Sequence, residues 1–262
     1  MDLFLKDKVA VITGAAKGVG GEITRALYNE GCKLILLGRD ESAIATLCDS
    51  IGIIDDCMVM TCDIRNDKIV DDAIANGMKR FGRIDILVNV AGIAGPVGKP
   101  LWEIQAEEYN NIFDTNTKGC FNLIRAVSPI MIKQRYGKII NIGGTFGIHG
   151  KAGRSIYSSS KWALRGITKS SAIELGKYNI NVNYIAPGMI AGRRFNEEVC
   201  ESTAKEAGRT IDDIANDWAK SYALQRITEG NDVANCVLFL ASDRSRQITG
   251  CDIIVDGGWA SL

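Results

Sequence analysis

The sequence predicts one α/β domain with a doubly wound parallel sheet of about seven strands and helices on both faces. Two observations lead to this fold class. Short apolar runs rich in β-branched residues alternate with longer amphipathic segments along the whole chain. The apolar runs are nearly continuous, which is typical of strands buried on both faces of a parallel sheet. Because no linker, repeat or low-complexity tract interrupts residues 1–262, we expect a single domain.

The first half of the chain supplies the first expected strands. The run KVAVITG ends at a glycine, and the segment after it places Ile23, Ala26 and Leu27 on one face of a helix that stops at Gly31. In chain order we expect a strand at 8–14, a helix at 20–32, strands at 33–38 and 57–63, a helix at 68–82 and a strand at 84–92.

The second half continues the alternation. We expect helical structure at 107–134, a strand at 137–143, a helix at 157–177, a strand at 180–187, a helix at 231–241 and a last strand at 251–258. Residues 192–225 are irregular, polar and charged, with helical patches. This stretch follows the carboxyl end of a strand, where ligands bind in such folds, so we expect it to act as a lid over the substrate.

The composition excludes several classes of protein. The 31 basic residues balance 31 acidic residues, so no overall charge attracts a nucleic acid or a membrane surface. No apolar stretch approaches the roughly 18 residues that cross a bilayer, and the charged start MDLFLKDK is unlike a signal peptide. We therefore expect a cytoplasmic protein. The 8 cysteines form no CxxC pair and there is 1 histidine, so we expect reduced thiols and no metal site.

The segment TGAAKGVGG, residues 13–21, joins the first strand to the first helix. Gly14, Gly18 and Gly20 permit a sharp turn and let peptide N–H groups at the helix N-terminus approach a pyrophosphate. Val19 lies inside the same turn and belongs to the predicted cofactor site. In a Rossmann-like fold, a dinucleotide binds at this position.

The end of the second strand indicates which dinucleotide binds. An acidic residue there would accept the ribose hydroxyls of NAD, but this chain has Gly38 and Arg39. The Arg39 guanidinium would bind a 2′-phosphate, and Lys17 in the glycine turn would add a second positive charge. We therefore favour NADP(H) over NAD(H). The alternative is that both cations are solvated side chains at the surface.

Tyr157 and Lys161 in YSSSK stand four residues apart, so both project from one face of a helix. A phenol is a poor acid or base at neutral pH, and a lysine cation beside it favours the phenolate. The pair therefore predicts a proton donor and acceptor. Taken alone, it is also compatible with a solvated helix face.

Further motifs accompany this pair in a fixed order. They are the glycine turn, NVAG at 89–92, Asn116 in a helical stretch, YSSSK, and PG at 187–188. As a set, the motifs and their spacings resemble the short-chain dehydrogenase/reductase family, and the chain looks like its 3-oxoacyl-ACP reductase-like members. The resemblance covers essentially the whole chain, down to the terminal ITGCDIIVDGG. It implies an NAD(P)-dependent oxidoreductase, and a homotetramer built on long helices and the C-terminal strand.

The resemblance also implies a role for each site residue. Tyr157 would donate and accept the proton of the carbonyl or alcohol oxygen. Lys161 would favour the phenolate and hold the nicotinamide ribose, and Asn116 would hold a water that links Lys161 to solvent. The implied contacts with the adenine, the cofactor ribose and the nicotinamide fall, in that order, on Asp63 with Ile64, on Asn89, and on Pro187, Gly188 and Ile190.

The chain departs from the family pattern next to the tyrosine. The family usually has a serine 13 residues before it, where this chain has Gly144. A hydroxyl follows at Thr145, which a regular strand would turn to the opposite face. Because Gly143 and Gly144 free the backbone, we expect Thr145 or a peptide N–H to take the serine's role. The alternative is that the donor is missing. Gly192, where a threonine is frequent, and Val90 in NVAG are further departures.

Cationic side chains gather at the expected mouth of the site. They are Lys151, Arg154, Arg193 and Arg194, with His149 in the same loop as the first two. They predict an anionic substrate, with His149, Arg154 and Arg193 as candidate contacts. Scattered solvated charge is the alternative. Three aromatic residues would either wall the site or pack in the core: Phe195, Trp218 and Tyr222.

The sequence therefore predicts an enzyme that transfers a hydride between NADP(H) and a carbonyl or secondary-alcohol substrate. One alternative is a slow or non-catalytic nucleotide-binding regulatory protein of the same fold. Another is a reductase of carbon–carbon double bonds, and the spacing of Tyr157 and Lys161 counts against it.

Overall fold

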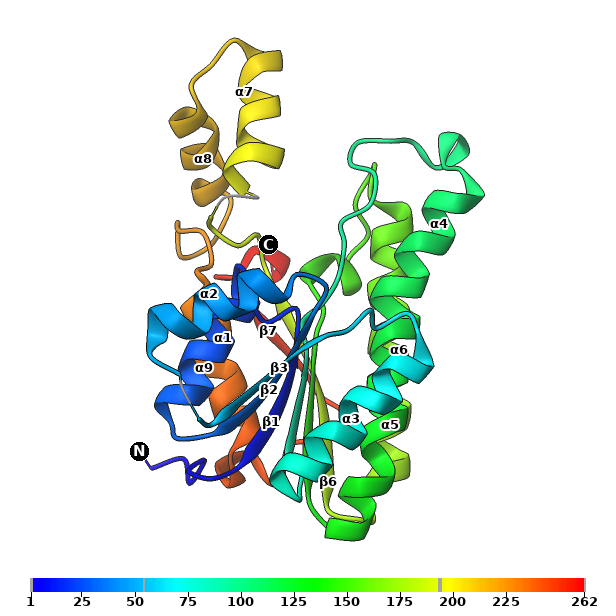
Figure 1. The fold of residues 1–262 in the computed structure, drawn as a ribbon. Helices are drawn as coiled ribbons and strands as arrows, with labels where there is room; N and C mark the ends of the chain where they lie inside the picture. The colour runs from blue at the N-terminus through cyan, green and yellow to red at the C-terminus, as the bar shows by residue number, and fades with distance from the viewer. Residues whose placement is uncertain (1, 54, 193–194, 262) are drawn as a thin grey trace.

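A computed structural model describes residues 2–53, 55–192 and 195–261 of the chain. Within these residues it confirms the predicted parallel sheet, a 7-stranded sheet in the order β3-β2-β1-β4-β5-β6-β7 (Figure 1). The strands are β1 (Val9–Thr13), β2 (Lys33–Gly38), β3 (Cys57–Thr61), β4 (Ile86–Asn89), β5 (Gly137–Ile142), β6 (Ile180–Pro187) and β7 (Asp252–Val255). Most are shorter than predicted at one or both ends.

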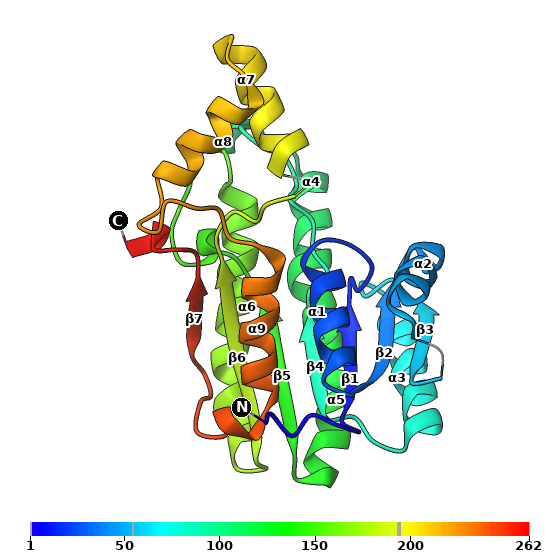
Figure 2. The same cartoon turned by 90° about the vertical axis from the view of Figure 1, so that its left-hand side faces the viewer.

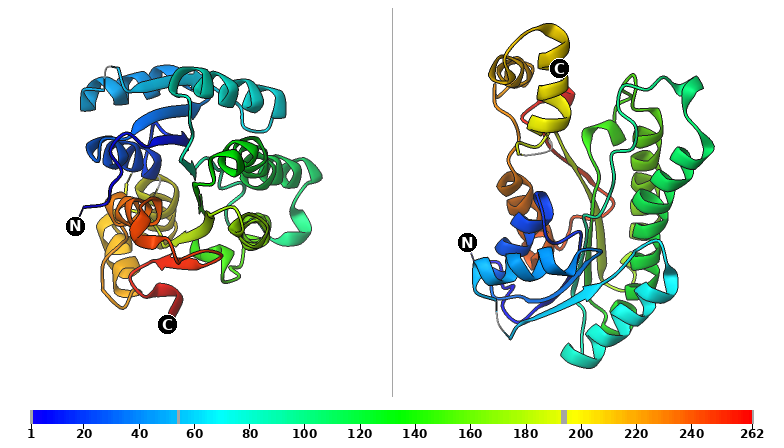
Figure 3. Two further views of the ribbon diagram at one scale, coloured as in Figure 1. Left: turned by 90° about the horizontal axis from the view of Figure 1, so that it is seen from below. Right: turned by 45° about the horizontal axis from the view of Figure 1, so that its top comes forward.

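Helices cover both faces of the sheet, as the continuous apolar strands require. One layer contains α1 (Val19–Asn29), α2 (Glu41–Ile51) and α9 (Gly230–Ala241). The opposite layer contains α3 (Asp67–Phe81), α4 (Ala106–Phe113), α5 (Gly119–Gln134) and α6 (Ser155–Gly176). Figures 1 and 3 show the sheet between these two layers. A separate cluster of buried apolar side chains fills the space on each side.

Two helical features differ from the prediction. Helix α2 was not predicted, because only Ile44 and Cys48 of its residues are buried and its apolar pattern is weak. The Asp40 carboxylate begins it by accepting the Ala43 peptide N–H at 3.0 Å. The expected helical region 107–134 is interrupted by a π-helical segment, Asp114–Lys118, between α4 and α5.

The strand order places the predicted nucleotide turn at the switch point of the sheet. The chain moves outward from β1 to β2 and β3, then returns to the other side of β1 at β4. In such sheets, ligands bind outside the carboxyl ends of the strands at this point. The Thr13 hydroxyl fixes the crevice on one side, because it accepts the peptide N–H groups of Val90 and Ala91 at 3.0 and 3.1 Å.

The described part of the insertion, residues 195–225, forms an arm above the carboxyl ends of the strands (Figures 1 and 2). It contains a π-helical segment (Phe195–Glu201), α7 (Ser202–Ala207) and α8 (Ile211–Lys220). A small apolar cluster of its own holds it together, with Phe195, Cys200, Ala204 and Ile214 buried. Its predicted function as a lid remains a prediction.

No helix among the described residues is long and apolar enough to cross a membrane. The same part of the chain contains no group of His, Cys, Asp and Glu side chains that could hold a metal ion.

Candidate active site

Helix α6 positions the two residues that the sequence singled out first. Tyr157 and Lys161 share one face of this helix, and the Lys161 Nζ lies 5.9 Å from the centroid of the Tyr157 ring. Tyr157 is partly exposed, whereas Lys161 is only 4% exposed. The Lys161 ammonium donates to the Ile142 carbonyl at 3.1 Å. The carboxyl end of β5 therefore holds the cation beside the phenol.

Asn116 enters the site from the π-helical segment. Its side-chain oxygen accepts the Ile93 peptide N–H at 2.8 Å, and its amide nitrogen donates to the Ile93 carbonyl at 3.0 Å and the Ser160 hydroxyl at 3.1 Å. A Cβ added to Gly92 would lie 3.1 Å from the Asn116 oxygen and 3.4 Å from the Lys161 Nζ. Asn116 and Lys161 thus converge on one glycine, and the π-helical segment is a common way to redirect such a side chain.

The two adjacent glycines before Tyr157 face different groups. A Cβ on Gly143 would overlap the Cζ and hydroxyl atoms of Tyr184, which is fully buried on β6. A Cβ on Gly144 would meet only the Tyr157 hydroxyl within 4 Å, at 3.3 Å. The structure therefore places the position of the absent serine beside the Tyr157 phenol. The sequence analysis did not identify Tyr184.

Thr145 begins a 3₁₀ turn, Thr145–Gly147, instead of continuing β5. The residue as a whole is 5% exposed, and no hydrogen bond of its hydroxyl is found among the described residues. The hydroxyl is therefore available to a ligand. The turn also removes the face alternation that would have pointed Thr145 away from the site.

The glycine turn fits a dinucleotide phosphate. Gly14 and Gly18 have φ angles of 64° and 54°, which favour glycine. A Cβ on Gly20 would overlap the Gly14 carbonyl oxygen, and one on Gly14 would lie 3.0 Å from the Ala91 Cα. Helix α1 begins at Val19, so its free peptide N–H groups are available to an anion at this turn.

The buried Asn89 gives a second sign that a ligand belongs in the crevice. Its side chain is 1% exposed, and its amide nitrogen donates to the Asn141 oxygen at 2.9 Å. Its own oxygen is buried and has no hydrogen-bond partner among the described residues. Buried polar atoms are rarely left unpaired, so this acceptor fits a cofactor ribose hydroxyl.

At the predicted adenine end, Asp63 is held by Arg65. The guanidinium contacts both carboxylate oxygens, with the shortest distance 2.6 Å, and these hydrogen bonds lower the pKa of the Asp63 carboxyl from its usual value. A cavity of about 600 Å³ opens beside the pair and is also lined by Asp114 and Lys118. The neighbouring Ile64 is buried against Gly119 at the start of α5.

The predicted 2′-phosphate contacts include an acidic neighbour that the sequence analysis did not consider. Lys17 lies 3.5 Å from the Asp40 carboxylate, and both side chains are largely exposed. Hydrogen bonds from the Ser42 hydroxyl and the Ala43 peptide lower the pKa of Asp40, so it stays charged. Arg39 is exposed at the end of β2. Asp40 therefore competes with any phosphate for Lys17.

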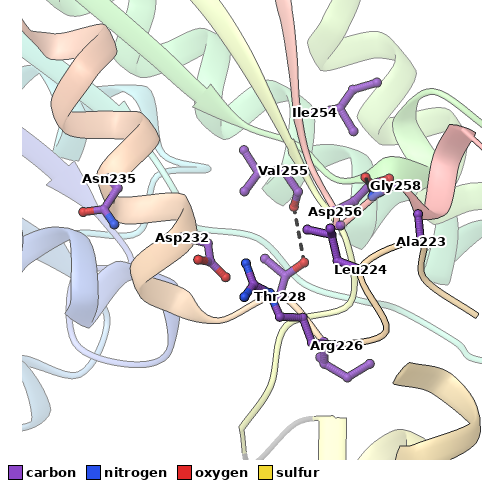
Figure 4. Close-up of a pocket in the computed structure, with 12 residues that line it drawn as sticks. Ala223, Leu224, Arg226, Thr228, Asp232, Asn235, Ile254, Val255, Asp256 and Gly258 are labelled. Atoms are coloured by element: carbon purple, nitrogen blue, oxygen red, sulfur yellow. Dashed lines mark hydrogen bonds between the residues drawn. The ribbon is translucent and has the colours of Figure 1, made fainter. Parts of the chain in front are cut away.

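At the nicotinamide end, Pro187 closes β6 and Gly188 follows in a confined turn. A Cβ on Gly188 would lie 3.0 Å from the Asp256 Cβ and 3.2 Å from the Thr228 hydroxyl. Ile190 forms a β-bridge with Thr228. Figure 4 shows a cavity of about 670 Å³ that shares Thr228 and Asp256 with this turn. Gly192, the position of the frequent threonine, has no atom within 4 Å of an added Cβ.

Aromatic rings surround the exposed side of Tyr157. The Phe146 ring meets Tyr157 edge-on at 6.4 Å and Trp259 at 5.7 Å, and His149 meets Trp259 at 6.5 Å. The Arg154 guanidinium lies over the Tyr157 ring at 5.0 Å. Arg154 thus contacts Tyr157 directly, whereas His149 contacts Trp259, and their role as substrate contacts stays a prediction. The sequence analysis missed Phe146 and Trp259.

Other residues expected near the mouth of the site were two arginines and three aromatic residues. Arg193 and Arg194 lie outside the described residues. Phe195 and Trp218 meet edge-on at 6.3 Å within the insertion. Tyr222 is buried, and its hydroxyl accepts the Met189 peptide N–H at 2.9 Å.

A glycine turn at the sheet switch point and a tyrosine–lysine pair beside it define a dinucleotide-dependent oxidoreductase of the α/β class. A family model described as Enoyl-(Acyl carrier protein) reductase matches residues 14–260. The chain belongs to the short-chain dehydrogenase/reductase family, as predicted.

Named relatives agree with this assignment. (+)-Borneol dehydrogenase 2 of Salvia officinalis is 32% identical over 262 residues, covering 100% of this chain and 92% of the relative. The 3-oxoacyl-(acyl-carrier-protein) reductase FabG of Staphylococcus epidermidis is 33% identical over 254 residues, covering 96% of this chain and 98% of the relative. The structure of NAD⁺-bound xylitol dehydrogenase matches with a TM-score of 0.90 at 28% identity, covering 97% of this chain and 100% of that one. The protein is an oxidoreductase that transfers a hydride between a nicotinamide cofactor and a carbonyl or alcohol substrate.

The packing around Tyr184 gives a stability prediction. Gly143→Ala is expected to lower the free energy of unfolding by about 1–3 kcal/mol, because its methyl group would overlap the Tyr184 ring. Urea unfolding measures the change. Gly166→Ala on α6 is the control, since an added Cβ there meets nothing within 4 Å and alanine favours the helix. Equal stability of the two variants would contradict the packing.

Proposed function

We propose that the protein interconverts a ketone and a secondary alcohol with NADP(H), and that Tyr157 transfers the proton. The observation that supports this most is the environment of Tyr157: the Lys161 ammonium lies 5.9 Å from the centroid of its ring, and the Cβ position of Gly144 lies 3.3 Å from its hydroxyl. All three lie at the carboxyl ends of β5 and β6, next to the switch point where a dinucleotide binds. When bound, the cofactor supplies the hydride and accepts it in the reverse reaction.

The side chains divide the remaining work. Tyr157 gives its proton to the carbonyl oxygen as the hydride arrives and takes it back in the oxidation. Lys161, held by the Ile142 carbonyl, places a positive charge beside the phenol and keeps two N–H donors for a ribose hydroxyl and water. Asn116 holds the Ile93 peptide next to Lys161. We assign it to the path by which a water replaces the proton that Tyr157 has given to the substrate.

We assign the missing serine's role to Thr145. The reacting oxygen needs a second hydrogen-bond donor, and the Thr145 hydroxyl has no partner among the described residues. Its position one residue after Gly144 puts it in the turn that faces Tyr157.

We assign NADP(H) as the preferred cofactor on the charges at the end of β2. Arg39 and Lys17 supply two cations, and Gly38 leaves no carboxylate where an NAD site needs one. Asp40 opposes this preference because it pairs with Lys17. A relative of the same fold binds NAD⁺, so this local charge balance, rather than the fold, decides the preference.

We propose an anionic or polar ring-bearing ketone as the substrate. Arg154 over the Tyr157 ring supplies positive charge, and Phe146 with Trp259 supplies an aromatic wall. Two of the relatives are named for borneol and for a 3-oxoacyl group on acyl carrier protein.

We further propose a homotetramer in the cytoplasm, with the arm at 192–225 as the lid. Exposed apolar side chains on α5 and α6 support assembly through these long helices: Phe121 is 49% exposed, Trp162 46% and Ile173 84%. The arm stands over the carboxyl ends of the strands, where a lid would meet the substrate (Figure 2).

The description of the matching family model raises reduction of carbon–carbon double bonds as a second candidate. The contact between Lys161 and the ring of Tyr157 favours carbonyl chemistry, because the phenol needs the cation to move a proton onto oxygen. A non-catalytic nucleotide-binding protein would not need this pair.

Turnover of NADPH with ketones tests the proposal. Absorbance of the reduced nicotinamide should fall with a panel of neutral and acidic cyclic ketones and β-keto thioesters, and enoyl thioesters should give no turnover. Tyr157→Phe should lower kcat by about 10²–10⁴-fold, because it removes the proton donor and keeps the ring.

Cofactor binding by the Tyr157→Phe variant, measured by fluorescence titration of NADPH, should match that of the native protein and show that the site is intact. Equal turnover by the two proteins would refute the assignment of Tyr157. Reduction of enoyl thioesters alone would favour the second candidate.

Thr145→Val tests the replacement donor. The two side chains have nearly the same shape, so only the hydroxyl is lost, and kcat should fall by about 10²-fold. The Michaelis constant for NADPH should not change. An unchanged kcat would show that another group stabilises the reacting oxygen.

Asp40→Asn tests the charge balance at the 2′-phosphate. Asparagine keeps the N-terminal cap of α2 and frees Lys17, so the ratio of kcat/KM for NADPH to that for NADH should rise about threefold. The gain should shrink at high salt, because both side chains are exposed. A ratio that does not change would mean that Lys17 takes no part in cofactor selection.

A further inference from the structure

Tyr184 is a buried phenol that the proposed chemistry does not use. It lies on β6, is fully buried, and packs with Cys120, Leu164 and Ala186. Its hydroxyl donates to the Gly144 carbonyl at 3.3 Å. This hydrogen bond joins the core of the sheet to the residue that replaces the serine.

The loop after β5 is built around this phenol. A Cβ on either Gly143 or Gly147 would overlap the Tyr184 ring or hydroxyl. Gly143 and Gly147 therefore leave the space that the Tyr184 side chain fills. Close packing of this kind restricts the loop to one conformation.

The Tyr184 hydroxyl is also close to the catalytic groups. A Cβ added to Gly147 would overlap the Tyr184 hydroxyl and would lie 2.9 Å from the Lys161 Cβ. The Cβ position of Gly144, whose carbonyl it binds, lies 3.3 Å from the Tyr157 hydroxyl. Gly144 thus lies between the two tyrosines: its carbonyl accepts the Tyr184 hydroxyl, and its Cβ position lies beside the Tyr157 hydroxyl.

Burial also favours the neutral form of the Tyr184 phenol, which can donate a hydrogen bond. It raises the pKa of this phenol above its ordinary value, and the neighbouring Tyr157 adds to the shift.

We propose that Tyr184 is a positioning residue for the reaction. By holding the Gly144 carbonyl and filling the space above Gly143 and Gly147, it fixes the loop so that Thr145 and the peptide groups beside it face the oxygen bound at Tyr157. A serine side chain at 144 would reach that oxygen directly from the end of the strand. This chain reaches it from a turn, and Tyr184 sets the geometry of the turn. The inference rests on the proposed roles of Tyr157 and Thr145.

Tyr184→Phe tests the inference, because it removes the hydroxyl and leaves the ring to fill the space beside the glycines. We expect kcat for the ketone to fall about fivefold, in line with the loss of one neutral hydrogen bond. The Michaelis constant for NADPH should stay within error, and the melting temperature should fall by no more than about 2–4 °C. Tyr136→Phe is the matched control, since it also removes a buried phenol hydroxyl and lies at the opposite end of β5.

A double-mutant cycle with Thr145→Val separates positioning from general stability. If Tyr184 acts through the loop, Tyr184→Phe should lower kcat less in the Thr145→Val background than in the native protein. An unchanged kcat in Tyr184→Phe, a loss of melting temperature alone, or a fully multiplicative double variant would overturn the inference. A Tyr157→Phe protein with native turnover would instead refute the proposed function, so the two failures are distinct.

Discussion

The placement of the Lys161 ammonium is the constraint on which the rest of the site depends. Lysine is rarely buried, and this one is 4% exposed with the Ile142 carbonyl as its protein partner at 3.1 Å. A buried cation needs further electron-rich neighbours, and the Tyr157 phenol and a cofactor ribose are suited to that need. The parallel sheet provides this arrangement, because the carboxyl end of β5 and the first turns of α6 meet beside the switch point between β1 and β4.

The loop between β5 and α6 shows how a family site can be rebuilt without its usual side chain. Gly143 and Gly147 leave room for the ring of Tyr184, and Gly144 leaves room beside the Tyr157 hydroxyl. A smaller side chain at position 184 would open a cavity, and a larger one at position 143 or 147 would overlap the Tyr184 ring or hydroxyl. These three positions therefore depend on one another. Gly144, where the family usually has a serine, thus belongs to a loop that packs against Tyr184 on β6.

The sequence predicted the parts of the structure that follow from local patterns. The pairing of Tyr157 with Lys161 depends on helix geometry alone, and the glycine turn depends on its place after a strand. The position of Tyr184 beside Gly143 could not be predicted in this way, because it requires the register of β5 against β6, in which Asn141 pairs with Tyr184. Three further features likewise depend on tertiary structure. They are the π-helical segment, the ion pair between Asp40 and Lys17, and the contact of the Trp259 ring with Phe146 in the loop after β5. Helix α2 was missed because it buries little apolar surface.

A crystal structure of the complex with NADPH and a slowly reduced ketone would test the central claim most directly. We expect the ketone oxygen to lie about 2.6–3.2 Å from the Tyr157 hydroxyl and within hydrogen-bond distance of the Thr145 hydroxyl. We also expect the Lys161 ammonium to bridge the Ile142 carbonyl and a ribose hydroxyl. A complex in which the ketone oxygen binds away from Tyr157, or in which Lys161 points away from the ribose, would contradict it.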